Sequence, residues 1–145
     1  MTGAVEVLVE AVWGRIRTLA LAADRLDRLP ENPGGVAAVE GTGELVAREF
    51  VLRLWRVATD PTNYALLRRL VRDSSVPLVE LSGEVDLPPL AVAERVADLV
   101  QVGLVARSLV GDEVQATAAA TAVVELLEAV QAEVARRVEG WAKRP

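Results

Sequence analysis

Residues 60–117 carry a dense series of helix starts, helix ends and turn signals, and this series leaves the chain few possible folds. Asp60 and Pro61 mark a strong helix start. An Asp side chain accepts hydrogen bonds from the free amides of the first turn, and Pro at the first helical position loses no hydrogen bond. Ser74-Ser75 ends the run of helix-forming residues. The sequence therefore predicts one helix between these two signals.

The rest of this unit predicts two further helices and a hairpin. The expected elements are a short strand at 76–78, a small helix at 79–85, a helix at 89–102, strands at 104–110 and 113–117, and a two-residue turn at Gly111-Asp112. Gly103 is expected to end the last helix, because glycine adopts the left-handed backbone conformation at low cost. This order of elements predicts a mainly α-helical winged helix-turn-helix fold with a small β-hairpin wing.

Long helices are expected on both sides of this unit. The first, within residues 1–29, places apolar residues at alternating steps of four and three, which is the heptad seam of a helix that packs on a partner. The last, at 118–142, carries a similar stripe. A long helix packed only on its own domain is the alternative. We expect a homodimer whose interface contains Val5, Val9, Val12, Ile16, Leu19, Leu127, Val130, Val134 and Trp141.

The remaining segments complete one domain spanning 1–145. Its expected parts are an N-terminal dimerisation helix (1–29), a loop rich in Gly and Pro (30–43), a central helix (44–58), the winged unit (60–117) and a C-terminal dimerisation helix (118–142). Apolar residues cover much of the circumference of the central helix, so we expect it to be largely buried.

Composition excludes several kinds of chemistry. The 145 residues include no cysteine and no histidine, so disulfides, thiolate chemistry and imidazole acid-base catalysis are excluded. The serines lack a histidine base, and we expect no enzyme activity, no cofactor and no metal site. The first residues lack the basic start of a signal peptide. We expect a cytoplasmic protein.

The distribution of charge opposes strong binding to nucleic acid. The net charge is −5. Residues 60–117 contain five arginines against nine acidic residues, whereas residues 118–145 carry four of each sign. The charge deficit therefore lies in the unit that would meet DNA, where a positive surplus is expected.

Residues 60–117 resemble the ArsR-type winged-helix transcriptional regulators, and MarR-type regulators share the same core. The matching landmarks are Asp60-Pro61-Thr62, Leu67, Leu70, Val79-Glu80-Leu81, Val92, Val96, Leu99 and Gly103-Leu104-Val105. The resemblance implies a homodimer that binds operator DNA. The metal ligands of the metal-sensing members, Cys and His, are missing here, so soft-metal sensing is not expected.

The second helix of the helix-turn-helix, at 89–102, should be the reading helix that enters the major groove. It opens with Pro88 and Pro89, which have no N–H for a phosphate, and it carries Glu94 and Asp98 on its exposed side. The remaining candidates for DNA contact are Arg95, Arg107, Gln101, Arg68 and Arg69. Ordinary surface ion pairing is the alternative role of these arginines, for example Arg95 with its helix neighbours.

Two functions remain open on the sequence alone. One is a dimeric winged-helix regulator whose DNA contact is weakened by an acidic and apolar reading helix. The other is a winged-helix module that no longer binds DNA and binds a protein instead, with Leu90 and Ala91 in an apolar contact surface and Glu94 and Asp98 at its rim.

Overall fold

The computed structural model describes residues 2–27 and 43–144. The expected loop at 30–43 lies outside the described residues except for Gly43, which begins a helix. The elements follow the order α1 (Thr2–Asp27), α3 (Gly43–Thr59), α4 (Pro61–Arg72), β1 (Val76–Pro77), α5 (Leu78–Val85), α6 (Pro89–Gln101), β2 (Val105–Arg107), β3 (Glu113–Ala116) and α7 (Ala118–Ala142).

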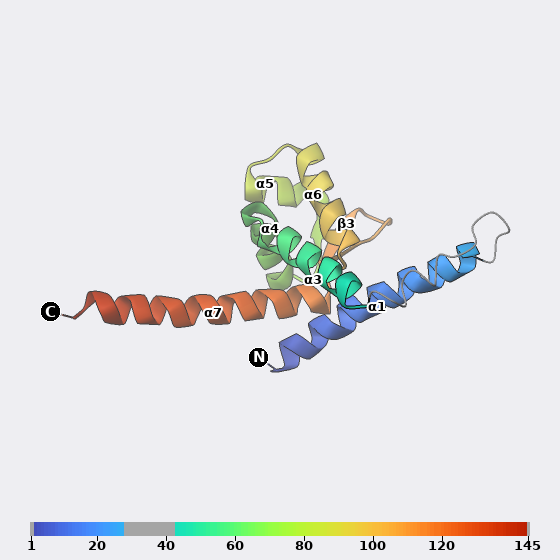
Figure 1. The fold of residues 1–145 in the computed structure, drawn as a ribbon. Coiled ribbons are helices and arrows are strands. Elements are labelled where there is room, and N and C mark those ends of the chain that lie inside the picture. The colour runs from blue at the N-terminus through green and yellow to red at the C-terminus, as the bar shows by residue number, and fades with distance from the viewer. Residues whose placement is uncertain (1, 28–42, 145) are drawn as a thin grey trace.

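Helices α4, α5 and α6 form a compact unit with a small antiparallel sheet (Figure 1). The strand order is β1-β3-β2, so β3 is central, and Val114 pairs with Val76 on one side and Arg107 on the other. The core is apolar and continuous. Its fully buried large side chains are Leu66, Leu67, Leu70, Leu81, Leu99, Leu104, Val76, Val92, Val96, Val114 and Val123. Helices α5 and α6 thus form the helix-turn-helix, and the hairpin β2–β3 is the wing.

The helix ends follow from local chemistry. One carboxylate oxygen of Asp60 accepts hydrogen bonds from the amides of Thr62 (3.0 Å) and Asn63 (3.1 Å), which caps α4. Gly103 has φ +80° directly after Val102, the C-cap residue of α6, and Asp86 has φ 51° in the turn between α5 and α6. Glycine adopts this left-handed region freely, and Asp adopts it more readily than most residues.

The wing differs from its prediction. Its strands are shorter than expected, and five residues, 108–112, separate β2 from β3 instead of two. The Ser108 side chain explains the longer loop, because its hydroxyl donates to the Val110 carbonyl (2.9 Å) and accepts from the Val110 amide (3.2 Å). These local bonds compete with the extension of the ladder. Gly111 and Asp112 do both adopt positive φ.

The expected burial of the central helix was wrong. Within the described chain α3 buries only Leu54 and Ala58. Leu45 is 59% exposed and Leu52 is 51% exposed. The helix packs against α4, α6 and α1 along one side, and its other apolar side has no cover within the described residues. The number of apolar residues on α3 therefore exceeds what the described residues cover.

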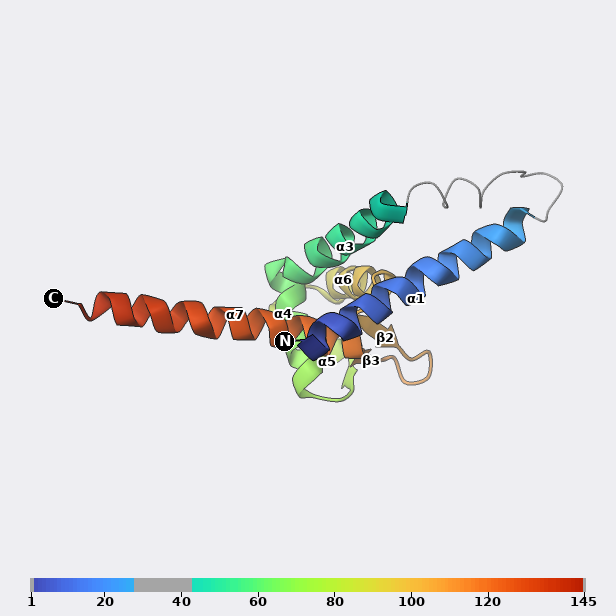
Figure 2. The ribbon, with the colours of Figure 1, turned by 60° about the horizontal axis from the view of Figure 1, so that its bottom comes forward.

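The two long helices cross and then diverge. Residues near the N-terminus of α1, such as Ala4 and Val7, lie beside the first turns of α7, including Ala118 and Ala122. Beyond this crossing the two helices extend from opposite sides of the winged unit (Figures 1 and 2). The C-terminal half of α7 has no packing partner among the described residues. None of the described helices is long and apolar enough to cross a membrane.

Candidate nucleic-acid interface

The outer face of α6 is the surface that a winged helix presents to a DNA groove. Its exposed residues are Pro89, Leu90, Glu94, Ala97, Asp98 and Gln101. Leu90 is 73% exposed, and Pro88 caps the helix without a side-chain hydrogen bond. Glu94 and Asp98 are the charged groups of this face, and both are acidic. The surface therefore combines apolar contact with negative charge.

Arg95, the central candidate for a base contact, is directed to α4. Its Nη1 donates to the capping oxygen of Asp60 (2.7 Å) and to Oδ1 of Asn63 (3.2 Å). Asn63 is 5% exposed, and its own Nδ2 donates to the carbonyl of Val57 (2.9 Å). Arg95 thus joins the reading helix to the start of α4. The sequence suggested that Arg95 pairs with acidic residues on α6. Its actual partner, Asp60, lies before α4, and spacing along a single helix could not identify it.

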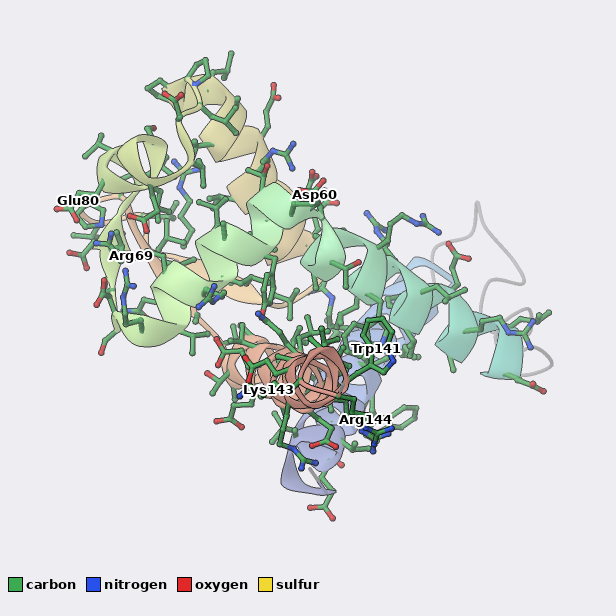
Figure 3. The ribbon with its side chains drawn as sticks, turned by 90° about the vertical axis from the view of Figure 1, so that its left-hand side faces the viewer. Asp60, Arg69, Glu80, Trp141, Lys143 and Arg144 are labelled. Carbon is green, nitrogen blue, oxygen red and sulfur yellow. The ribbon has the colours of Figure 1, made fainter. Side chains whose placement is uncertain are left out.

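Arg69 is the most enclosed of the candidates. Its side chain is 21% exposed and forms ion pairs with Asp73, Glu84 (2.8 Å) and Glu80 (3.6 Å). Figure 3 shows Arg69 and Glu80 on the same side of the winged unit. The hydrogen bond with Asp73 is the largest of the causes that raise the pKa of Arg69 above its ordinary value. The contact with Asp73 follows an i,i+4 spacing that the sequence contains. This arginine holds α4 and α5 together.

The other candidates on α4 and in the wing are also paired. Arg68 lies 3.3 Å from a carboxylate oxygen of Glu128 on α7. Arg107 contacts Asp112 across the wing at 2.7 Å. The tip of the wing beyond it is apolar and almost fully exposed, with Leu109 at 98%. Neither pair is deeply buried, so each contributes little to stability.

Gln101 lies at the end of α6 and accepts a hydrogen bond from Nη2 of Arg53 on α3 (2.8 Å). It therefore belongs to a junction between α3 and α6 and not to the N-terminal part of the reading helix, where base contacts concentrate.

One property is common to all the arginines of the winged unit. Each of the five cations within 60–117 lies within 4.0 Å of a carboxylate of the same chain, and these residues are Arg68, Arg69, Arg72, Arg95 and Arg107. A phosphate would have to compete with an existing ion pair at every one of them. The described residues contain no group of three or more acidic side chains arranged to hold a metal ion.

The residues expected at a dimer interface are largely exposed where the structure describes their side chains. On α7 the exposed fraction rises along the stripe, from 51% at Val130 and 53% at Val134 to 74% at Trp141, and Leu127 is partly buried. On α1, Val5 and Val9 are 51% and 57% exposed. The side chain of Leu19 lies outside the described residues.

A groove of about 410 Å³ runs between α1, α3 and α7. Its lining residues carry no charge, and they are Val5, Leu8, Val9, Val12, Trp13, Ile16, Ala47, Val51, Trp55 and Leu126. Four of the α1 residues expected at the interface, Val5, Val9, Val12 and Ile16, therefore share one apolar surface with α3. Sequence reasoning missed the contribution of α3, because it assigned that helix to the core.

Comparison with known proteins shows the fold. No family model matches the chain, and no curated protein matches it. Among solved structures, HlyU from Vibrio cholerae N16961 is similar with 21% identity and a TM-score of 0.50, over 57% of this chain and 92% of that one. An ArsR family transcriptional regulator shares 23% identity over 68% of this chain and 96% of the other, with a TM-score of 0.45. The similarity to HlyU confirms the predicted winged-helix fold.

Proposed function

We propose that this chain is a cytoplasmic, dimeric winged-helix protein of the transcriptional-regulator type whose contact with DNA is weak. The observation that carries the proposal is the pairing of all five arginines of the winged unit with carboxylates of the same chain. The winged-helix fold supports a regulator, and the resemblance of residues 60–117 to the ArsR-type regulators favours the same function.

Weak DNA binding follows from the charge of the surface. Affinity for duplex DNA comes mainly from neutralising phosphates and releasing their counterions. The outer face of α6 has no cation, and Glu94 and Asp98 would face the phosphates. Freeing Arg95 would leave the capping oxygen of Asp60 without its ionic partner. Both effects lower the affinity without changing the fold.

Dimerisation is supported by apolar surface that the described residues leave uncovered. The stripe on the C-terminal half of α7 and the apolar groove beside α1 lie on the same molecule. Large contiguous apolar surfaces on a folded chain mark interaction sites. A second copy offers the matching surfaces in a closed, symmetric arrangement.

Fluorescence anisotropy with a random-sequence duplex, at low and at moderate salt, tests the DNA part. We expect weak binding that decreases steeply with salt. The double substitution Glu94→Arg and Asp98→Arg should raise the affinity by about tenfold or more at low salt and steepen its salt dependence, because it converts two repulsive charges to phosphate contacts.

A matched control keeps the same charge change away from the proposed surface. Glu125 and Glu139, which are exposed on α7 and form no ion pair among the described residues, give a second double substitution to Arg with an identical change in net charge. Equal gains from both double variants would show that net charge alone sets binding. No gain from Glu94→Arg and Asp98→Arg would contradict the assignment of α6 as the reading helix.

Binding to a protein is the second candidate, and the exposure of Leu90 favours it. A 73% exposed leucine beside Glu94 and Asp98 fits an apolar contact with an acidic rim. In a pull-down, Leu90→Asp should lose a partner that the wild-type chain retains. Leu109→Asp, at a leucine that is 98% exposed on the wing, is the control. Partners kept by the Leu90 variant would count against this function.

A further inference from the structure

A second hollow, of about 260 Å³, lies where α1, α3 and the end of α6 meet. Figure 2 shows α6 between α3 and α1 in this region. Its floor is apolar, with Leu54 and Val102 only 4% and 7% exposed. The complete lining consists of Val12, Arg15, Phe50, Arg53, Leu54, Gln101 and Val102.

Two arginines from different helices, Arg15 and Arg53, line this hollow. Arg53 extends from α3 and donates from Nη2 to Gln101 Oε1 (2.8 Å). Arg15 extends from α1, and its aliphatic stem lies against Gly103, with Cδ 3.1 Å from the position that a Cβ would take there. Among the described residues, neither forms an ion pair with a carboxylate, whereas every arginine of 60–117 does. Two cations without a carboxylate partner among the described residues therefore line one hollow of an acidic chain.

We propose that this hollow binds a small organic acid, with its carboxylate held by Arg15 and Arg53 and its apolar body on Leu54 and Val102. Arginine binds carboxylates through two parallel N–H donors. Gln101 contributes amide N–H donors, since its oxygen is already occupied by Arg53. The volume of about 260 Å³ lies below the usual range for ligand cavities, which selects a short acid. The apolar floor disfavours an inorganic anion.

The proposed site does not depend on the DNA and dimer proposals. Its position between two helices means that a bound acid would affect how those helices are arranged. Its walls come from α1 and from the end of the reading helix α6. A bound acid would bridge these helices and favour one arrangement of the two. The bound acid would also raise the free energy of unfolding, and this increase would grow with the logarithm of the ratio of acid concentration to Kd.

Isothermal titration and thermal unfolding of the full chain with benzoate and with hexanoate test the proposal. Benzamide and hexanamide, the neutral amides of similar size, are the ligand controls. We expect both acids to bind and to raise the Tm, and the amides to have little effect. Arg53→Gln and Arg15→Gln should each weaken binding by about tenfold or more, because each removes a charged hydrogen-bond donor.

Arg56→Gln on α3 and Arg17→Gln on α1 are the protein controls, since both arginines are exposed and neither lines the hollow. They should bind the acids as the wild-type chain does. If Arg15→Gln unfolds because its packing on Gly103 is lost, the Arg53→Gln variant still tests the proposal, since Arg53 is exposed. The proposal is overturned if neither acid binds, if the amides bind equally, if Arg53→Gln has no effect, or if inorganic phosphate displaces both acids with equal affinity.

Discussion

Gly103 combines two constraints at a single residue. Its φ of +80° disfavours any residue with a Cβ, and an added Cβ would lie 3.1 Å from Cδ of Arg15. Gly83, in the middle of α5, has nothing within 4 Å of the same position. The backbone conformation therefore requires glycine at position 103. At position 83 neither the backbone nor the packing requires glycine, and its presence weakens the helix.

We expect Gly103→Ala to lower the free energy of unfolding by about 1–2 kcal/mol. Gly83→Ala should raise it by about 0.5–1 kcal/mol, because alanine favours a helix interior. Chemical denaturation of both variants measures the two changes. Equal effects of the same sign would contradict the distinction.

Tyr64 is the chain's one tyrosine, and its hydroxyl is buried without a hydrogen-bond partner among the described residues. Burial raises the pKa of Tyr64 above its ordinary value of 10.0, and the nearby charge of Glu128 adds to the effect. A raised pKa in the folded state means that the neutral phenol is favoured by folding. This contribution to stability is therefore complete below pH 10.0 and is lost as the pH rises through the folded pKa.

Tyr64→Phe should leave the free energy of unfolding at neutral pH unchanged or raise it by up to about 1 kcal/mol, because it removes an unpaired hydroxyl. It should also reduce the loss of stability above pH 10.0. The absorbance of tyrosinate in the wild-type chain reports the titration directly. Ionisation at or below pH 10.0 in the folded protein would contradict the burial.

At the scale of elements, the helices and their order could be predicted from the sequence, because their signals are local. The start of α4 at Asp60-Pro61 and the end of α6 at Gly103 each depend on chemistry within a few residues. The wing loop was predicted too short, because the bonds of the Ser108 side chain compete with the turn chemistry of Gly111 and Asp112.

The candidate site was less predictable, because its residues act across elements. Arg95 was identified as a cation on the reading helix, but its partner Asp60 lies 35 residues earlier. The apolar residues of α3 indicated burial without indicating what covers them. A pattern of apolar residues predicts that a helix face is covered. It does not show whether the core of the same chain or a second copy of the chain covers that face.

Helix α7 supplies the element-scale prediction. Val130 belongs to its exposed apolar stripe, and Ala132 faces away from that stripe. We expect Val130→Glu to convert the proposed dimer to a monomer with unchanged helix content, because a carboxylate would be buried at the proposed interface. Ala132→Glu, which adds the same charge on another face, should remain dimeric. Light scattering measures the mass, and a dimeric Val130 variant would contradict the interface.

For the whole molecule, the crossing of α1 and α7 produces two helical extensions that the other described residues cover little. Such a chain should gain stability from association, so its Tm should rise with protein concentration. The Val130→Glu variant should unfold at a Tm that is lower and independent of concentration. A scanning calorimetry series over a wide range of concentration measures this, and a constant Tm for the wild-type chain would contradict association.

The hydrogen bonds of Asp60 restrict how the sequence of this protein can change. One oxygen of this residue accepts from two amides of α4 and from Arg95 of α6. A substitution that removes the carboxylate to release Arg95 toward a groove also removes the cap of α4, unless the new side chain can cap the helix itself. Asp60→Asn would keep the cap and lose the charge, whereas Asp60→Ala would lose both. A variant in which Arg95 is released toward a groove should therefore arise through Asp60→Asn more readily than through Asp60→Ala, because only the asparagine keeps the cap of α4.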